Sequence, residues 1–255
     1  MKGAAVSDTN NEPKPMYTLE QIIRGAQLRA PLLARMAAWI SFHRCRRRFQ
    51  GTGNAVSYHP TCRFNRTEFD IRGRRNRIEI GRDCILKNVK FIIKGDDHSV
   101  VIGDACAIAG GTIWMEDDHG RLEIGQGTTI EEASFSLAEP HSSVRIGPQC
   151  MLAQGIDFRT SDSHSIIDLD GNRTNWPANI EIGEHTWICA NVSILKGVEV
   201  AGDSIIGDRA VVTRQFAEKN VVIAGVPATV IRRGVSWRRE RTPHPNGASL
   251  AIFPP

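Results

Sequence analysis

The chain has 255 residues and a formal net charge of +4, with 41% hydrophobic, 24% charged and 6% aromatic residues, as expected of an ordinary globular protein. No stretch approaches the roughly 18 consecutive apolar residues of a membrane span, and the polar first residues lack the apolar core of a secretory signal. Aromatic residues are too few for stacking along a nucleic acid. These features argue against three classes of protein, namely a membrane transporter, a secreted mini-protein and a nucleic-acid-binding protein.

The basic charge is concentrated at the N-terminal side. Residues 1–50 contain nine Lys or Arg and three Asp or Glu, which gives this segment +6 and leaves −2 for the remainder. We expect residues 1–16 to be disordered and residues 17–50 to form a basic helical segment, interrupted or begun at Pro31. One interpretation packs its apolar face on the end of the following domain or on a neighbouring subunit. In the other, residues 17–49 contact an anionic membrane surface.

A repeat of six residues dominates the rest of the chain. Aliphatic side chains return at Ile182, Ile188, Ile194, Val200, Ile206 and Val212. Helices repeat every 3.6 residues and strands every two, so neither explains a period of six, whereas a triangular coil with one short strand per side does. Upstream, Ile-Gly pairs recur every 22 residues, at 80, 102, 124 and 146. We interpret this as the same coil with four residues added at one corner, around 95–98, 117–120 and 139–142. The pattern predicts an all-β solenoid.

The cysteines follow the same register. Cys62, Cys84, Cys106 and Cys150 are separated by 22 residues or by twice that number, with Thr128 at the position between. We expect a column of small side chains in a narrow interior instead of a metal or disulfide set, because no C-x-x-C spacing occurs. Free thiols fit a reducing cytoplasm. We assign the solenoid to residues 56–217 with an extended polar loop at 160–179, a C-terminal cap to 218–237 and a disordered tail to 238–255.

The Ile-Gly hexapeptides, followed by IAGVPATVIRR at 223–233, resemble the left-handed β-helix acyltransferases over residues 56–233. Within that superfamily the chain is most similar to the galactoside, xenobiotic and capsule-polysaccharide O-acetyltransferase branch. The resemblance implies a left-handed parallel β-helix that assembles as a homotrimer. It also implies acetyl-CoA as cosubstrate, bound along the cleft between adjacent solenoids, and a carbohydrate as acceptor.

The resemblance further implies a catalytic histidine in a loop that leaves the coils. Its match is His164 in TSDSHSI, 23 residues before Trp187 in IGEHTWI. Because an unperturbed imidazole has a pKa near ~6.5, His164 suits a general base that removes the hydroxyl proton. Asp162 is expected to orient or polarise that imidazole, and Trp187 to contact the reaction centre through its ring or its backbone N–H. The structural alternatives are a solvated loop histidine and a tryptophan that only forms a wall of the coil.

By the same resemblance, the residues expected to bind coenzyme A are Ala190, Asp208, Thr213, Arg214 and Arg232. The hydroxyl and the two guanidinium groups suit pantetheine oxygens and phosphates. Asp208 departs from the small residue that is usual in the family and adds a negative charge, which puts the local pose of the coenzyme in doubt.

Histidines recur at the inserted corner, at positions 98, 119 and 141, and His164 follows. We interpret them as a ridge and assign His119, His141 and also His185, in the Trp187 turn, to substrate-lining positions; the alternative is a set of solvated turn residues. We expect no metal site, because the His-x4-His pair of the metal-dependent carbonic anhydrases on this fold is absent.

Together these features predict an acetyl-CoA-dependent O-acetyltransferase that modifies capsular polysaccharide, lipopolysaccharide or a related glycan, located in the cytoplasm or peripherally at the inner face of the membrane. We expect direct attack in a ternary complex, since no cysteine or serine stands out as an acyl carrier. Two alternatives stay open: an N-acyltransferase that acts on an amino sugar nucleotide, and a solenoid scaffold without catalytic activity. Replacement of His164 by alanine separates the enzyme from the scaffold.

Overall fold

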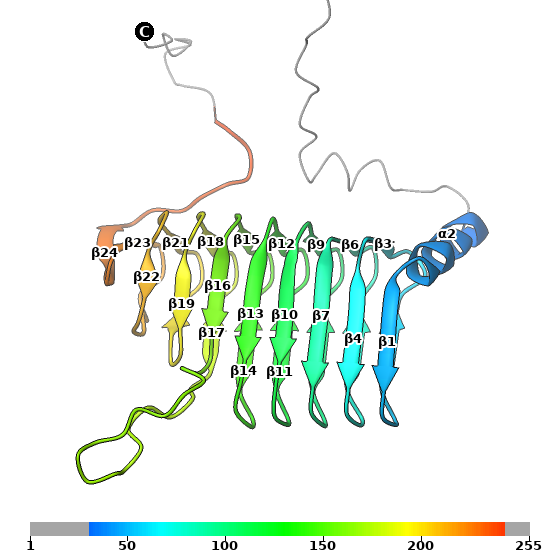
Figure 1. The fold of residues 1–255 in the computed structure, drawn as a ribbon. Helices are drawn as coiled ribbons and strands as arrows, with labels where there is room; N and C mark the ends of the chain where they lie inside the picture. Colours follow the sequence, from blue (N-terminus) through cyan, green and yellow to red (C-terminus); the bar gives the residue numbers. More distant parts are fainter. Residues whose placement is uncertain (1–30, 243–255) are drawn as a thin grey trace, which may run out of the picture.

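Three long parallel sheets run side by side along the molecule and surround one narrow interior (Figure 1). The computed structural model describes residues 31–242. Each turn of the chain adds one strand to sheet A, one to sheet B and one to sheet C, in that order, so the coil has a triangular cross-section. The fold is a left-handed parallel β-helix with one short helix at its N-terminal side, which confirms the predicted fold class.

The strands of each sheet are hydrogen-bonded in chain order. Sheet A contains β1 (Arg46–Gln50), β4 (Glu68–Arg72), β7 (Val89–Lys94), β10 (Gly111–Met115), β13 (Ala133–Leu137), β16 (Ile156–Arg159), β19 (Ser193–Leu195) and β22 (Val211–Val212). Sheet B contains β2 (Ala55–Tyr58), β5 (Arg77–Ile80), β8 (Ser99–Ile102), β11 (Arg121–Ile124), β14 (Ser143–Ile146), β17 (Ile180–Ile182) and β20 (Glu199–Val200). Sheet C contains β3 (Arg63–Asn65), β6 (Ile85–Lys87), β9 (Ala107–Ile108), β12 (Thr129–Ile130), β15 (Met151–Leu152), β18 (Trp187–Ile188), β21 (Ile205–Ile206), β23 (Val221–Gly225) and β24 (Ala228–Arg233).

Three edges join the sheets, and we name them by the sheets they connect. Edge AB includes residues 95–98, 117–120 and 139–142; edge BC includes 147–150, 183–186 and 201–204; edge CA includes 153–155, 189–192 and 207–210. The four extra residues of the longer coils were expected at one corner alone. Strands β4 and β7 have five and six residues, whereas β19 and β22 of the shorter coils have three and two. Part of the insertion therefore lengthens sheet A.

The interior is filled by columns of like side chains. Cys62, Cys84, Cys106 and Cys150 are fully buried, and each thiol donates a hydrogen bond to a glycine carbonyl of the following coil at 2.9 to 3.2 Å. Burial raises the pKa of Cys150 to about 11, so this thiol stays protonated and unreactive. The predicted interior cysteine column is confirmed.

Helix α2 (Pro31–His43) covers the N-terminal end of the solenoid, where it packs against β3 (Figure 1). The sequence predicted helical structure to residue 50, and this is wrong. Residues 46–50 are strand β1, in which Arg46 is opposite Glu68 and Arg48 opposite Asp70 of β4. Pairing of this cationic run with the carboxylates of the next coil favours the strand. Residues 1–30, which include the expected disordered segment, lie outside the described part. Within residues 31–242, no helix is long and apolar enough to cross a bilayer.

The C-terminal end is closed by an antiparallel pair. Strand β23 continues sheet C beyond β21, and β24 folds back on β23. The chain then returns across the solenoid, where Arg239 donates hydrogen bonds to Thr129 Oγ1 (2.7 Å) and to the Cys150 carbonyl (3.0 Å). The expected disordered tail from residue 238 is therefore wrong for 238–242, because these contacts fix it; residues 243–255 are outside the described part.

Candidate functional site

An arm formed by residues 160–179 leaves the solenoid at edge AB, between β16 and β17 (Figure 1). Its two sides meet in an antiparallel bridge between Ile167 and Arg173. At its tip, the Asp168 carboxylate accepts hydrogen bonds from the backbone amides of Asp170 (3.0 Å) and Asn172 (2.8 Å). Aspartate commonly closes turns in this way, so the arm is a small hairpin with a defined end.

Asn175 holds the two sides of the arm together at its base. Its side chain is buried, with 8% exposed. The amide nitrogen donates to Asp162 Oδ2 and to the His164 carbonyl, both at 2.7 Å, and the amide oxygen accepts from the Ile166 N–H at 2.7 Å. Since one buried side chain fixes three positions of the opposite side, Asn175 sets the path of the backbone at His164.

Two ion pairs tie the base of the arm to the solenoid. Arg173 forms a bidentate pair with Glu139 of edge AB at 2.7 and 2.6 Å, and the Ser161 hydroxyl donates to the same carboxylate at 2.5 Å. Lys196, which follows β19, lies 2.5 Å from Asp162. Arg173 lowers the pKa of Glu139, and Lys196 lowers the pKa of Asp162. Both carboxylates are therefore ionised near neutral pH.

His164 is exposed on this arm, held through its backbone. Asp162 was expected to orient its imidazole, yet between residues 31 and 242 no hydrogen bond joins the carboxylate to that ring; Asp162 binds Lys196 and Asn175 instead. The reason is local. Ser163 adopts a φ of 62°, which turns the chain between the two residues. Asp162 therefore positions the arm and the Lys196 ammonium.

Only part of the expected histidine ridge forms an exposed column. His119 and His141 are exposed on edge AB and their rings stack with centroids 4.7 Å apart and an angle of 2° between planes. His98 is buried, and its ring accepts a hydrogen bond from the Gly120 N–H at 3.0 Å. His98 is therefore a structural residue of the interior and not part of the exposed stack beside the arm.

Trp187 and His185 lie away from the arm. Trp187 is on β18 of sheet C, half-buried, with its ring centroid 6.1 Å from that of Trp237. His185 is on edge BC, where Nδ1 lies 3.0 Å from Asp203 Oδ1 and the ring stacks on Trp237 at 4.4 Å. One chain therefore does not bring His164 and Trp187 together.

The residues expected to bind coenzyme A occupy separate parts of the surface. Ala190 and Asp208 lie on edge CA in consecutive coils, where the backbone of residue 209 donates to the Ala190 carbonyl at 2.9 Å. Thr213 and Arg214 follow β22 at the sheet A side, and Arg232 is on β24. All except Ala190 are exposed, but within one chain they do not converge on a single pocket.

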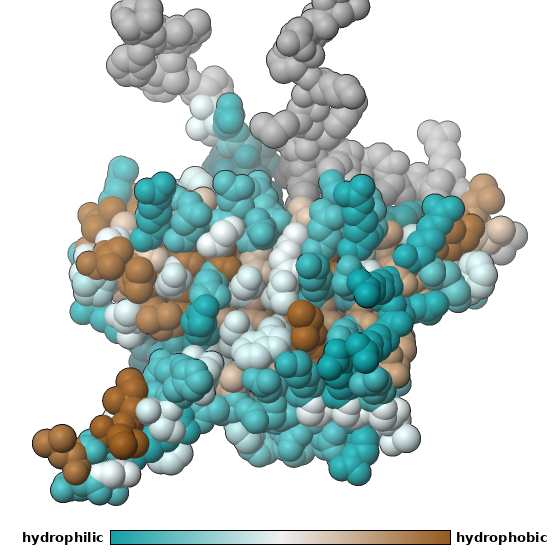
Figure 2. Space-filling view, in the orientation of Figure 1, coloured by the Kyte–Doolittle hydropathy of each residue, from teal (hydrophilic) through white to brown (hydrophobic). Residues whose placement is uncertain are grey.

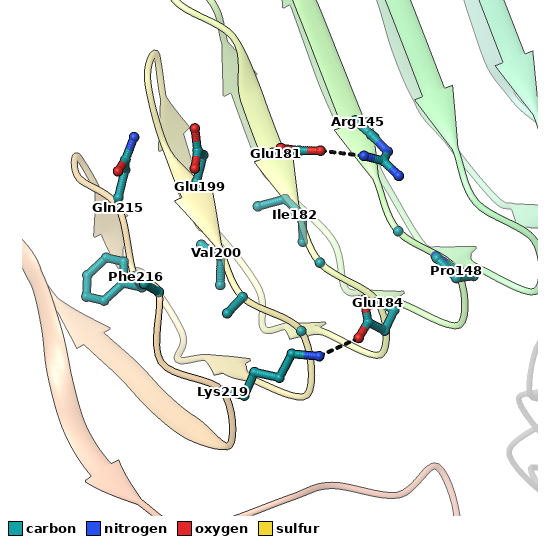
Figure 3. Close-up of a pocket in the computed structure, with 15 residues that line it drawn as sticks. Arg145, Pro148, Glu181, Ile182, Glu184, Glu199, Val200, Gln215, Phe216 and Lys219 are labelled. Atoms are coloured by element: carbon teal, nitrogen blue, oxygen red, sulfur yellow. Dashed lines mark hydrogen bonds and ion pairs between the residues drawn. The ribbon is translucent and has the colours of Figure 1, made fainter.

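Sequence reasoning missed a hollow of about 370 Å³ on sheet B. Figure 3 shows its charged rim, in which Arg145 pairs with Glu181 (2.6 Å) and Lys219 with Glu184 (2.7 Å), next to the ring of Phe216. None of the predicted site residues lines this hollow. The sequence feature that could have indicated this hollow is the series of charged residues at outward positions of successive sheet B strands. In the described chain, no group of three or more His, Cys, Asp or Glu could hold a metal ion.

Sequence reasoning also missed the residues that hold the base of the arm. Glu139, Arg173, Asn175 and Lys196 act through partners that are up to 34 residues away in the chain or on another coil. Spacing alone cannot reveal such partners, because the exit angle of the arm decides which side chains meet.

A triangular coil of hexapeptide repeats, with a polar arm that leaves one edge, defines a left-handed β-helix protein of the hexapeptide-repeat class. No family model matches the chain. A solved polysialic acid O-acetyltransferase, OatWY, is 32% identical, covers 78% of this chain and 93% of its own, and superposes with a TM-score of 0.73. The polySia-specific acetyltransferase NeuO is 30% identical over 77% of this chain and 88% of its own, with a TM-score of 0.64.

Sequence comparison finds relatives of the same kind. The polysialic acid O-acetyltransferase of Escherichia coli O1:K1 / APEC is 34% identical over 91 residues, which are 35% of this chain. The match spans 29% of the length of that curated relative. The solved structures extend the similarity over nearly the whole solenoid, and the chain belongs to the hexapeptide-repeat O-acetyltransferase family, as the repeats indicated.

Proposed function

We propose that the protein transfers an acetyl group from acetyl-CoA to a hydroxyl of a carbohydrate, such as capsular polysaccharide, lipopolysaccharide or a related glycan. The observation that carries the proposal is the anchored arm, which presents His164 from a solenoid 32% identical to an O-acetyltransferase over 78% of the chain. Family membership alone would not imply activity. The buried Asn175 at the base of the arm supports it further, because a catalytic base must be held in position.

In this reaction, the acceptor oxygen attacks the thioester carbonyl carbon while the imidazole of His164 takes the hydroxyl proton. The tetrahedral adduct collapses with cleavage of the C–S bond, and coenzyme A leaves as a thiol after it receives that proton. Hydrogen-bond donors stabilise the negative oxygen of the adduct. Trp187 supplies its ring to this centre, because its backbone N–H already donates to the Ser204 carbonyl at 2.9 Å, and Asp162 positions the arm.

The site is shared between copies in this proposal, and the protein acts as a homotrimer. The separation of His164 at edge AB from Trp187 on sheet C supports this assembly, since a second copy is needed to bring the two together. The residues proposed to bind acetyl-CoA are Ala190, Asp208, Thr213, Arg214 and Arg232. Exposed apolar side chains of the arm, Ile166, Ile167, Leu169 and Trp176, fit a contact with a neighbouring copy.

A long acceptor fits the surface next to the arm. Edge AB presents the stacked His119 and His141 as a continuous exposed strip beside the base of the arm. His185 stacks on Trp237 with 34% of its side chain exposed, and we propose that it lines the acceptor site from edge BC. We propose a cytoplasmic location, which the six free cysteines support.

The test is release of coenzyme A thiol from acetyl-CoA, measured with a colorimetric thiol reagent over a panel of sialic acid polymers, capsular oligosaccharides and galactosides. We expect acceptor-dependent release that falls by about 10²- to 10⁴-fold in His164→Ala. His59→Ala is the matched control, because His59 is an exposed histidine on edge BC near the N-terminal end. Equal release by wild type and His164→Ala would exclude His164 as the base. No release, together with no acetyl-CoA binding by calorimetry, would favour the scaffold.

A further inference from the structure

Helix α2 presents an apolar strip to the outside of the solenoid end. Its inward side chains, Ala38 and Phe42, are buried. Its outward strip consists of Leu33, Met36, Trp39 and Ile40, with 58, 52, 57 and 40% exposed. These positions are three or four residues apart and so share one face of the helix. Figure 2 shows apolar side chains gathered at this end of the molecule.

The orientation of this strip is fixed by the packing below it. The Phe42 ring lies 4.5 Å from the ring of Tyr58, 5.4 Å from that of Phe64 and 5.6 Å from that of Phe69, measured between centroids. The helix cannot rotate to bury Trp39 without removing Phe42 from this aromatic cluster. The apolar strip therefore remains outward in the folded protein.

The same end carries a net positive charge. Residues 31–67 contain seven arginines and no Asp or Glu. Arg35 and Arg44 on the helix side and Arg46 and Arg48 on β1 are exposed. Glu68 and Asp70 of β4 lie opposite Arg46 and Arg48, but in the described chain neither carboxylate is within ion-pair distance of these arginines. The excess of positive charge at this end attracts a polyanionic surface.

We propose that α2 and β1 dock on an anionic lipid bilayer, with Met36 and Trp39 in the interfacial region and the arginines against lipid phosphates. Tryptophan and aliphatic side chains beside arginine are the combination that binds membrane interfaces. A soluble polyanion would leave the apolar strip in water. A second copy joined end to end would bring the Arg46–Arg48 runs of two β1 edges together, and like charges on edge strands oppose such pairing.

Docking in this way leaves the proposed active site accessible. Helix α2 lies at one end of the solenoid, and the arm leaves it in the opposite half (Figure 1). The bilayer would hold the end of the solenoid and keep the arm clear of the surface. The inference is independent of acetyl transfer, because none of its residues belongs to the proposed site.

The experiment is co-sedimentation of the full chain with phosphatidylcholine vesicles, with and without phosphatidylglycerol. We expect binding to the anionic vesicles only, weakened about tenfold or more by high salt. The double variant Met36→Ser/Trp39→Ser should lower binding by about tenfold or more, while its circular dichroism and melting temperature stay those of the wild type. Trp114→Ser is the control for loss of a tryptophan elsewhere, because Trp114 is a partly exposed residue of β10.

Three results would overturn the proposal. They are equal sedimentation with neutral and anionic vesicles, no sedimentation with either, and binding by the double variant equal to that of the wild type. If the strip contacts a second copy instead, the wild type will not sediment with the vesicles. Light scattering will then show a lower oligomeric mass for the double variant than for the wild type. If the charge serves a soluble glycan, that polyanion will bind equally to wild type and double variant.

Discussion

Replacement of Asn175 by alanine tests whether the arm is held at its base. The change removes three hydrogen bonds of 2.7 Å, two donated by the amide nitrogen and one accepted by the amide oxygen, and a weaker one of 3.3 Å that the oxygen accepts from Arg173 Nε. Intramolecular hydrogen bonds contribute about 1 kcal/mol each, and the partners on the arm are exposed, so water replaces part of the loss. We expect local opening of the arm to become easier by about 2 kcal/mol, or roughly 30-fold.

Amide hydrogen exchange measures this opening directly. The Thr174 amide donates to the Ile166 carbonyl at 2.8 Å, a bond that the variant keeps, so its exchange reports the arm as a whole. We expect about 30-fold faster exchange there and a fall of about 10- to 100-fold in kcat/KM, since the path of the backbone at His164 changes. Asn172→Ala at the exposed tip should change neither. If the Thr174 amide exchanges at the same rate in Asn175→Ala as in the wild type, Asn175 does not hold the arm at its base.

Two further predictions concern the solenoid and the pH response of the arm. Gly95→Ala should prevent stable folding or lower the melting temperature sharply, because the φ of Gly95 is +114° and an added Cβ would lie 1.4 Å from a carbonyl oxygen of the next coil. Gly110→Ala should have little effect on a thermal melt, because Gly110 has no positive φ and its added Cβ would lie 3.4 Å from the nearest atom. The pKa of Glu139 is lowered in the folded state by Arg173, so the stabilisation is present above the ordinary carboxyl pKa of 4.5 and is lost as the pH falls below it. Because Arg173 lies over the Trp176 ring, tryptophan fluorescence should report a transition in that acid range that Glu139→Gln abolishes; an unchanged transition would contradict this role of the pair.

Much of the solenoid could be predicted because its repeat is a matter of local periodicity. Each interior position, such as Cys84 or Ile102, must be small or aliphatic to fit the narrow coil, and stacking returns the same requirement one coil later. The helix boundary failed for a different reason. A run such as Arg46–Arg48 has acceptable helix propensity, and only its pairing with strand β4, which places carboxylates opposite two of the arginines, makes it a strand. Such a partner is 22 residues away and is invisible to a local pattern.

The arm illustrates how far the repeat extends into the site. Residues with positive φ recur on edge AB at intervals of 22, at Asp97 (59°), His119 (59°), His141 (63°) and Ser163 (62°). Ser163 thus makes the same turn as His141 in the coil before it, and His164 is the residue at which the chain departs from the repeat. The periodicity therefore predicts where the arm begins, since the last regular turn is part of the pattern.

The path of the chain beyond that last turn depends on contacts instead of spacing. Position 164 is in register with Ser142, Gly120 and His98, which are all buried, so a regular coil would bury His164. The chain avoids this because the amide of Asn175 holds the His164 carbonyl and Arg173 holds the arm to Glu139. These bonds form only when the chain leaves the regular coil at residue 164. As a result, the imidazole at a position that the repeat would bury is exposed. The same step that breaks the pattern thus makes the side chain accessible for chemistry.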